Sequence, residues 1–209
     1  MAVLHNILMA DIIKSRKKNQ QQVKKQFAEL IAHVNKPYKN QLLSPLTITL
    51  GDEFQGVAKT IHSAIDIIQY LEELIVIKNI DWKLRYVLLQ GKIETEINPK
   101  IAYGMMGKGL AEARQQLISL KKTGNRFHIF LSNKTKMHKL NSLFIIYQMI
   151  VDDWGNKDYS LIKDFVELID YKKVAEANKK TYSQMWKRER SLHLKEYKII
   201  KNLIKEESL

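Results

Sequence analysis

Three carboxylates lie at positions where the sequence predicts ordered backbone. Asp11 interrupts a short apolar run near the amino terminus, which is typical of a central strand buried on both faces. Asp52 and Glu53 follow Gly51 at the tip of a predicted hairpin, because apolar residues alternate with threonine before that glycine and a second strand follows. Acids held by a rigid scaffold can bind a hard cation, so all three are candidate metal ligands.

Asp11 is the most informative of these acids. A carboxylate inside a buried strand is strongly unfavourable unless a cation neutralises it. One interpretation is a salt bridge to a basic residue, for which the sequence offers Lys14, Arg16 and Arg85. The other is that Asp11 and Asp52, on adjacent strands, bind Mg2+ or Mn2+ together. The residues alone leave both interpretations open.

The periodicity of the chain predicts an α+β fold followed by a helical region. Helical spacing predicts helices over about 19–34, 60–77 and 108–121, the first ended by Pro37, and apolar runs predict further strands over about 82–90 and 126–131. This order is typical of a mixed sheet, and we expect its helices on one side. Later helices are predicted over about 140–151, 161–169, 171–180 and 181–204. We therefore divide the chain into an α+β domain, 1–135, and a small all-α domain, 136–209.

Composition favours a polyanionic partner. The 209 residues carry a formal net charge of +13 and include no cysteine, which excludes disulfides, zinc–thiolate sites and thiol nucleophiles. Residues 171–205 hold eleven Lys and Arg against three Glu, so the positive charge is concentrated there. We expect a cytoplasmic protein without a membrane segment, because the first apolar run ends at Asp11 and is too short to span a bilayer.

The basic segment 171–190 has the pattern of a helix-turn-helix. Residues 178–180 would form the turn, and Thr181 would cap the second helix. The residues predicted to pack the two helices are Val174, Ala175 and Met185. The side chains predicted to face DNA, with hydroxyls for phosphates and amide or basic groups for base edges, are Tyr182, Ser183, Gln184, Lys187 and Arg188.

Four blocks of the sequence resemble the SatD family of bacterial proteins. The most characteristic are Asp-Ile-x-x-Ser-Arg from Asp11 and Gly-Asp-Glu-Phe-Gln from Gly51, and the others are 84–91 and 107–114. The resemblance spans nearly the whole chain. The same blocks are similar to the class III nucleotide cyclase and diguanylate cyclase domain, which implies a ferredoxin-like palm for the first domain.

The cyclase resemblance also implies roles for individual residues. In those enzymes one metal-binding Asp ends the first strand and another lies at a hairpin tip, positions that Asp11 and Asp52 occupy here. The resemblance assigns nucleotide contacts to Gly51, Arg85, Lys108 and Arg114. In an active enzyme Arg114 would have the catalytic role of neutralising phosphate charge in the transition state.

Three positions depart from the cyclase pattern. Leu110 replaces the asparagine that orients the ribose, Ile48 an adenine-reading lysine, and Leu50 the first glycine of the diguanylate cyclase hairpin. We therefore expect a DNA-binding regulator whose cyclase-like domain senses a nucleotide or cation. The alternative is an active metal-dependent nucleotidyl cyclase or nucleotidyltransferase. We also expect a homodimer, because both cyclase-like palms and helix-turn-helix proteins commonly act as dimers.

Overall fold

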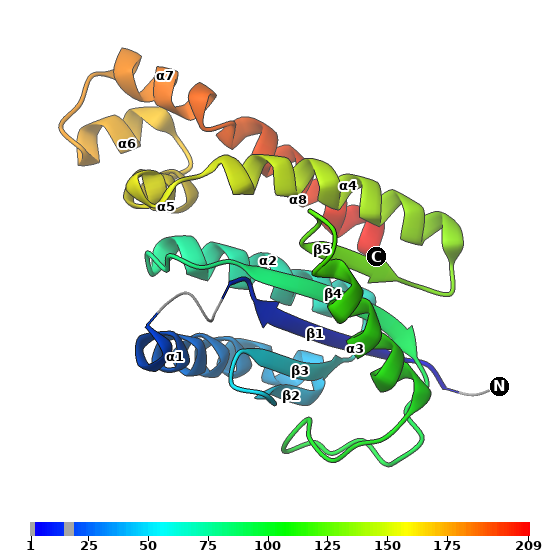
Figure 1. Ribbon diagram of the computed structural model, residues 1–209. Coiled ribbons are helices and arrows are strands. Elements are labelled where there is room, and N and C mark those ends of the chain that lie inside the picture. Colours follow the sequence, from blue (N-terminus) through cyan, green and yellow to red (C-terminus); the bar gives the residue numbers. More distant parts are fainter. Residues whose placement is uncertain (1–2, 15–18) are drawn as a thin grey trace.

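A five-stranded mixed sheet forms the centre of the fold in the computed structural model, which describes residues 3–14 and 19–209 (Figure 1). Its strands are β1 (His5–Ile12), β2 (Leu42–Ile48), β3 (Glu53–Ala58), β4 (Leu84–Gly91) and β5 (Phe127–Phe130). They lie in the order β2-β3-β1-β4-β5, with β1 antiparallel to both neighbours and β5 parallel to β4. The first four strands therefore have the ferredoxin-like order, and the predicted α+β class is confirmed.

Helices cover both faces of this sheet. On one face lie α1 (Gln20–Tyr38), a 3-10 turn (Lys39–Gln41) and α2 (Ile61–Ile77), and α3 (Lys108–Leu120) lies on the other. The expectation of helices on one side was wrong, because successive residues of β1 are apolar and bury both faces of the strand. Pro37 was also expected to end the first helix, but it lies within the last turn of α1, which continues one residue further, to Tyr38.

Close backbone contact fixes the direction of α3. A Cβ atom at Gly109 would lie 2.7 Å from the Cα of Gly91, so only glycine lets the helix start directly against the end of β4. The Glu94 carboxylate accepts a hydrogen bond of 2.9 Å from the Lys108 backbone N–H and so caps this end. From this start α3 runs across the sheet, and its carboxyl end reaches the end of β1.

Five further helices follow the sheet. They are α4 (Lys134–Asp153), α5 (Tyr159–Leu168), α6 (Tyr171–Ala177), α7 (Tyr182–Ser191) and α8 (Leu194–Ser208), with a 3-10 turn (Asn156–Asp158) before α5. The single helix predicted over 181–204 was wrong, because His193 has a φ of 51° and this left-handed residue separates α7 from α8. None of the helices in the described residues is long and apolar enough to cross a membrane.

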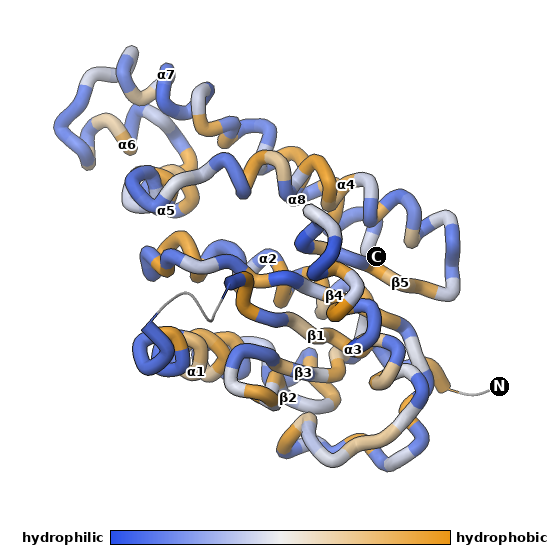
Figure 2. Tube along the Cα trace, viewed as in Figure 1, coloured by the Kyte–Doolittle hydropathy of each residue, from blue (hydrophilic) through white to orange (hydrophobic). Residues whose placement is uncertain are grey.

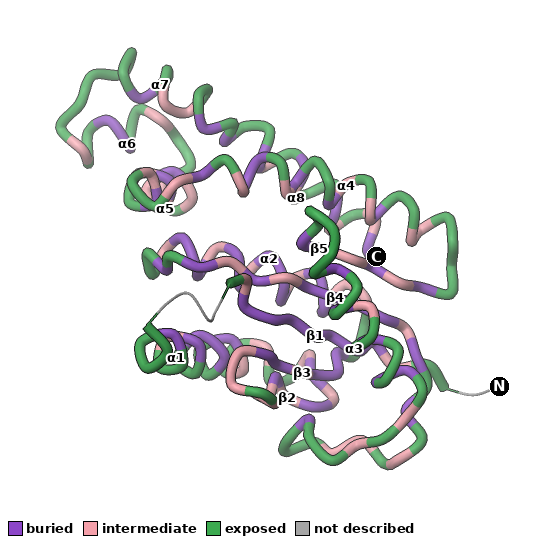
Figure 3. Tube along the Cα trace, viewed as in Figure 1, coloured by how far each residue is buried: buried purple, intermediate pink, exposed green. Residues whose placement is uncertain are grey.

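One hydrophobic core continues from the sheet into the helical layer. Phe144 and Tyr147 of α4 belong to the same buried cluster as Tyr86 and Phe127 of the sheet. Figure 3 shows β1 and α2 buried along most of their length, whereas α6 and α7 are mostly exposed. The predicted division at residue 135 falls within the start of α4 and stays a prediction.

Arg126 joins the helical layer to the sheet. Its side chain is 5% exposed and binds the Glu72 carboxylate through Nη2 at 2.8 Å and the Asp152 carboxylate through Nε at 2.9 Å. Its Nη1 also donates to the carbonyl of Leu84 at 2.8 Å. Burial alone would lower the pKa of Arg126, but the Glu72 and Asp152 carboxylates raise it above its ordinary value. One buried cation therefore holds α2, β4 and α4 together.

Candidate functional site

The predicted acids meet at the end of β1. Asp11 lies opposite Glu53 of β3 and opposite Arg85 of β4 in the strand register, and its side chain is only 4% exposed. The Asp52 carbonyl accepts a 2.9 Å hydrogen bond from the Ile12 N–H, which holds the hairpin tip against this strand end. The charge of Asp52 raises the pKa of Asp11, although less than burial does. The hairpin and β1 thus bring the three acids together.

Two basic side chains bind Asp11 directly. Arg85 donates from Nη1 to both carboxylate oxygens, at 2.9 and 3.1 Å. Lys121, which caps the carboxyl end of α3, lies with its Nζ 2.9 Å from Oδ2. Arg85 is one of the three partners that the sequence offered, whereas Arg16 lies outside the described residues. The interpretation of Asp11 as one member of a salt bridge is therefore confirmed.

Glu53 forms the second half of the cluster. Burial raises the pKa of its carboxyl, and the Arg114 guanidinium opposes that rise from 3.9 Å. Thr49 Oγ1 lies 3.4 Å from Oε1 of the same carboxylate. Asp11 and Glu53 are thus two buried acids on neighbouring strands, each facing a cation from α3.

Those two cations share one face of α3. Arg114 and Lys121 are seven residues apart, which is close to two helical turns, and about half of each side chain is exposed. Sequence reasoning found Arg114 through the cyclase resemblance but missed Lys121. The seven-residue spacing from Arg114 was the available signal, because it places Lys121 on the same helix face.

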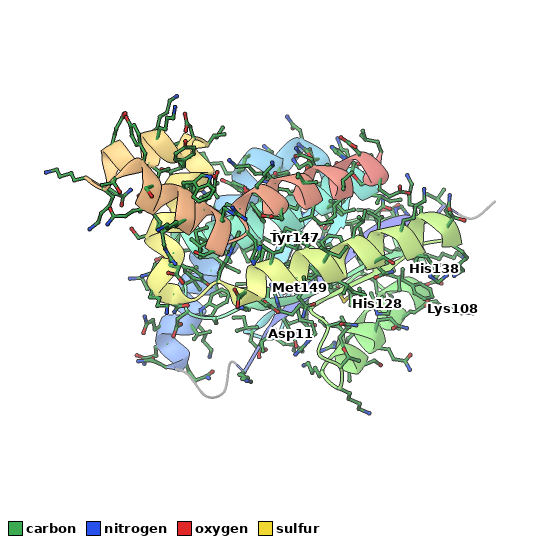
Figure 4. The ribbon with its side chains drawn as sticks, turned by 90° about the horizontal axis from the view of Figure 1, so that it is seen from above. Asp11, Lys108, His128, His138, Tyr147 and Met149 are labelled. Atoms are coloured by element: carbon green, nitrogen blue, oxygen red, sulfur yellow. The ribbon has the colours of Figure 1, made fainter. Side chains whose placement is uncertain are left out.

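Two further residues, Gly51 and Lys108, were assigned to nucleotide contacts, and they lie at different distances from the acidic cluster. Gly51 has a φ of +82° and forms the turn that presents Asp52. Lys108 begins α3, so the length of the helix, about 18 Å at 1.5 Å per residue, separates it from the carboxyl end beside Asp11. Figure 4 shows Lys108 and Asp11 well apart along this layer. Lys108 is therefore not part of the cluster.

The carboxylate oxygens of Asp11 are already occupied by basic partners, which bears on the predicted metal site. Carboxylate oxygens suit Mg2+ or Mn2+, but both oxygens of Asp11 already accept hydrogen bonds from cations. Burial also raises the pKa of Asp11, so its environment disfavours the ionised form that a metal requires. Within the described residues no group of three His, Asp or Glu is arranged to hold a metal ion. The arrangement does not fit a divalent cation as it stands, and the Mg2+ or Mn2+ assignment stays a prediction.

The raised pKa of Glu53 predicts a pH dependence of stability. An acid whose pKa is higher in the folded than in the unfolded state stabilises the fold below its ordinary pKa, and this contribution is lost as pH rises through the folded pKa. For Glu53 the loss begins near its ordinary value of 4.5 and extends upward. Glu53→Gln should therefore reduce the dependence of the free energy of unfolding on pH above about 4.5. At about pH 7 the variant should be at least as stable as the unmodified protein.

Urea denaturation at a series of pH values measures this effect. Glu112→Gln is the matched control, because Glu112 is an exposed acid on the same side of the sheet. If the free energy of unfolding of Glu53→Gln depended on pH in the same way as that of the unmodified protein, a raised pKa for the buried Glu53 carboxyl would be contradicted.

A second candidate site is the helix pair α6 and α7. Thr181 caps α7, and its side chain and that of Gln184 form a capping box. Lys179 has a φ of 51°, so a lysine takes the left-handed turn position that glycine commonly fills. The residues predicted to pack the pair, Val174, Ala175 and Met185, are all buried. The helices and the turn lie where the sequence pattern put them.

Three of the five side chains predicted to contact DNA have partners within the protein. Tyr182 donates its hydroxyl to Glu176 at 2.8 Å, Gln184 completes the capping box, and Arg188 lies 2.5 Å from the Asp158 carboxylate. Ser183 and Lys187 are exposed on α7. Arg190, which sequence reasoning missed, lies on the same side of the helix as Lys187, with its guanidinium 4.9 Å from the centre of the Trp186 ring.

Within residues 171–205, the exposed lysine and arginine side chains lie on this pair of helices and their connection, apart from Lys195 of α8. Along α8, Lys201 and Lys205 bind the acids Glu73 and Asp66 of α2, and Lys198 donates to the Ile169 carbonyl. The basic residues of α6, α7 and their connection that are exposed are Lys172, Lys173, Lys179, Lys180, Lys187 and Arg190. The basic residues near the carboxyl terminus therefore form two groups. Lysines of α8 bind acceptors within the protein, whereas those of α6, α7 and their connection face solvent.

The fold is similar to that of nucleotide cyclase domains. A bacterial light-regulated adenylyl cyclase aligns over 61% of this chain and 43% of its own, at 12% identity and a TM-score of 0.44. The guanylyl cyclase domain of a RhoGC fusion protein from the aquatic fungus Blastocladiella emersonii aligns over 68% of this chain and 86% of its own, at 16% identity and a TM-score of 0.48. This chain thus spans less than half of the light-regulated cyclase.

The family of the chain is defined by its sequence. The chain belongs to the SatD family, which it matches over residues 2–206. No curated protein matches it. The predicted resemblance is confirmed for the family and for the cyclase-like fold.

Proposed function

We propose that this SatD-family chain is a DNA-binding regulatory protein that responds to a nucleotide. In this proposal α6 and α7 bind DNA, and the two α3 cations Arg114 and Lys121, which lie over the buried acids Asp11 and Glu53, bind the phosphates of the nucleotide. The observation that supports the proposal is the group of exposed basic residues on the pair of helices α6 and α7, away from the acids that pair with the lysines of α8. Such a surface suits the phosphate backbone of a duplex.

Nucleotide binding is supported by the exposure of the two α3 cations. Arg114 and Lys121 are each half-exposed while the acids beneath them are buried. A polyphosphate approaching this surface would meet the two cations first. Lys121 would turn from Asp11 toward the phosphate, while Arg85, which is 12% exposed, would stay on Asp11 and keep its charge compensated.

Strand β4 supports a link between the two sites. Lys83, which directly precedes β4, binds Asp152 of α4. The first two residues of β4 continue the connection, because the Leu84 carbonyl accepts a hydrogen bond from Arg126 and Arg85 binds Asp11. A joint movement of the intact Asp11–Arg85 pair on nucleotide binding would therefore act on residues that hold α4. We propose this strand as the element that both ligands bias.

Among the described residues, the arrangement around Asp11 does not favour catalytic turnover of the nucleotide. The Asp11 carboxylate is paired with two cations, and Leu110 stands where cyclases carry the asparagine that orients the ribose. We therefore propose binding and sensing rather than catalysis.

Removing the two α3 cations should weaken nucleotide binding. Arg114→Ala with Lys121→Ala removes two charged hydrogen-bond donors, each worth about 1.5–3 kcal/mol, so the dissociation constant for ATP or GTP should rise at least about tenfold. Isothermal titration calorimetry with each triphosphate, with and without Mg2+, measures the change. Lys122→Ala, an exposed lysine beside Lys121, is the control. Equal loss in the control, or no binding of either triphosphate to the unmodified protein, would refute the nucleotide site.

A further inference from the structure

The outer face of α4 carries a regular stripe of exposed side chains. Its inner residues, including Phe144 and Tyr147, are fully buried against the sheet and α8. The exposed residues of the stripe recur at alternating intervals of three and four, as in the seam of a coiled coil. They are Lys139, Ser142, Ile146, Met149 and Asp153, which we call the α4 seam. The side chains of Ile146 and Met149 are 47% and 71% exposed. Neighbouring large apolar side chains that are exposed to solvent are typical of a surface that binds a partner.

Helix α8 extends this surface. It lies beside α4 in antiparallel orientation. One groove is lined by the start of α4 and the end of α8, and a second groove is lined by the end of α4 and the start of α8. The first groove has a volume of about 620 Å3 and is lined by the apolar residues Leu143, Ile146 and Leu203. The second, of about 380 Å3, is lined by Ile146 and Met149 with His193. Figure 4 shows the two helices side by side on one surface, with Met149 labelled, and Figure 2 marks the middle of α4 as hydrophobic.

The charges along the α4 seam are self-complementary. Lys139 lies at its amino end, with its Nζ 3.3 Å from the Glu207 carboxylate of α8, and the exposed Asp153 lies at its carboxyl end, with the apolar residues between them. In an antiparallel pairing of two copies centred on Ile146, Lys139 of each copy faces Asp153 of the other, since both are seven residues from the centre. Leu143 then faces Met149 by the same rule. The opposed helix dipoles also favour this orientation.

We propose that this face binds a second copy of the chain in a two-fold symmetric dimer, with α4 and α8 of each copy forming a four-helix layer. The reversal of charge about Ile146 is what an isologous interface requires, whereas an unrelated partner would need no such symmetry. Helices of 20 and 15 residues, each about 10 Å wide, present on the order of 500 Å2 per copy. Two such faces reach the roughly 1,000 Å2 at which specific interfaces begin. This dimer does not depend on the proposed DNA or nucleotide binding.

A charge exchange across the two-fold axis tests the dimer. Sedimentation equilibrium of the full chain should give a dimer whose dissociation constant rises about tenfold or more for Lys139→Asp alone or Asp153→Lys alone, because each places like charges together twice. The double variant Lys139→Asp/Asp153→Lys should return close to the unmodified value. Loss of dimer in both single variants without recovery in the double would refute the antiparallel pairing.

Cross-linking provides a second test that needs no loss of binding. The chain has no cysteine, so Ile146→Cys introduces a single thiol at the proposed axis. Oxidation in dilute solution should convert it largely to a disulfide-linked dimer. Ile118→Cys is the control, because Ile118 is 53% exposed on α3, on the other side of the sheet, and should stay monomeric. A chain that remains monomeric at all concentrations, or equal cross-linking of both variants, would overturn the proposal.

Discussion

Replacing Arg126 by methionine should lower the free energy of unfolding by about 3–5 kcal/mol, the range for breaking a buried ion pair from one side. The substitution leaves the Glu72 carboxylate, whose side chain is 9% exposed, without its cation. It also removes the donor to the Leu84 carbonyl and the contact to Asp152 of α4. We expect the loss to act on the joint between the sheet and the helical layer.

Urea denaturation followed by circular dichroism measures this loss. Arg114→Met is the control, because half of the Arg114 side chain is exposed and its removal should cost little. The double variant Arg126→Met/Glu72→Met should recover part of the stability, since it removes both buried charges rather than one. A loss below about 1 kcal/mol for Arg126→Met would mean that water or another cation compensates Glu72.

Replacing Lys187 and Arg190 together by alanine should weaken DNA binding by about ten- to a hundredfold and reduce the slope of log affinity against log salt by about two. Both residues lie on the exposed side of α7, and neither forms an ion pair among the described residues. Arg188 is left unchanged, because its pairing with Asp158 contributes to the packing of α7.

Fluorescence anisotropy with a labelled duplex at several salt concentrations measures both quantities. The double variant Lys100→Ala/Lys122→Ala removes the same charge from exposed positions outside the helical layer and serves as the control. An equal loss in the two double variants would show that net charge, rather than the α7 surface, determines binding.

Local patterns made much of this fold predictable. The short apolar run that Asp11 interrupts indicated a strand buried on both faces, and β1 is that strand. The helix pair α6 and α7 was predictable because its features lie within a few residues of one another, such as the cap at Thr181 and the buried Met185. Helical spacing likewise located α3 to within a residue at each end.

Contacts between distant segments could not be predicted in this way. The partner of Asp11 from α3, Lys121, is 110 positions away, and its role depends on α3 crossing the opposite face of the sheet. Arg126 looked like the start of an ordinary strand, because no local pattern indicates that a cation is buried against Glu72. Lys108 shows the converse case, since it shares a sequence block with Arg114 but lies at the far end of the helix from the cluster, and its assigned nucleotide contact stays a prediction.

The most direct test of the account measures whether the two proposed sites act on each other. DNA affinity is determined by anisotropy with and without a triphosphate that calorimetry has shown to bind. We predict that saturating triphosphate changes the DNA dissociation constant by about 5- to 150-fold, the usual range of allosteric coupling, and that DNA changes the nucleotide dissociation constant by the same factor. Arg114→Ala/Lys121→Ala should lose this change and keep the basal DNA affinity. Identical DNA affinity with and without saturating nucleotide would contradict a nucleotide-responsive DNA-binding protein.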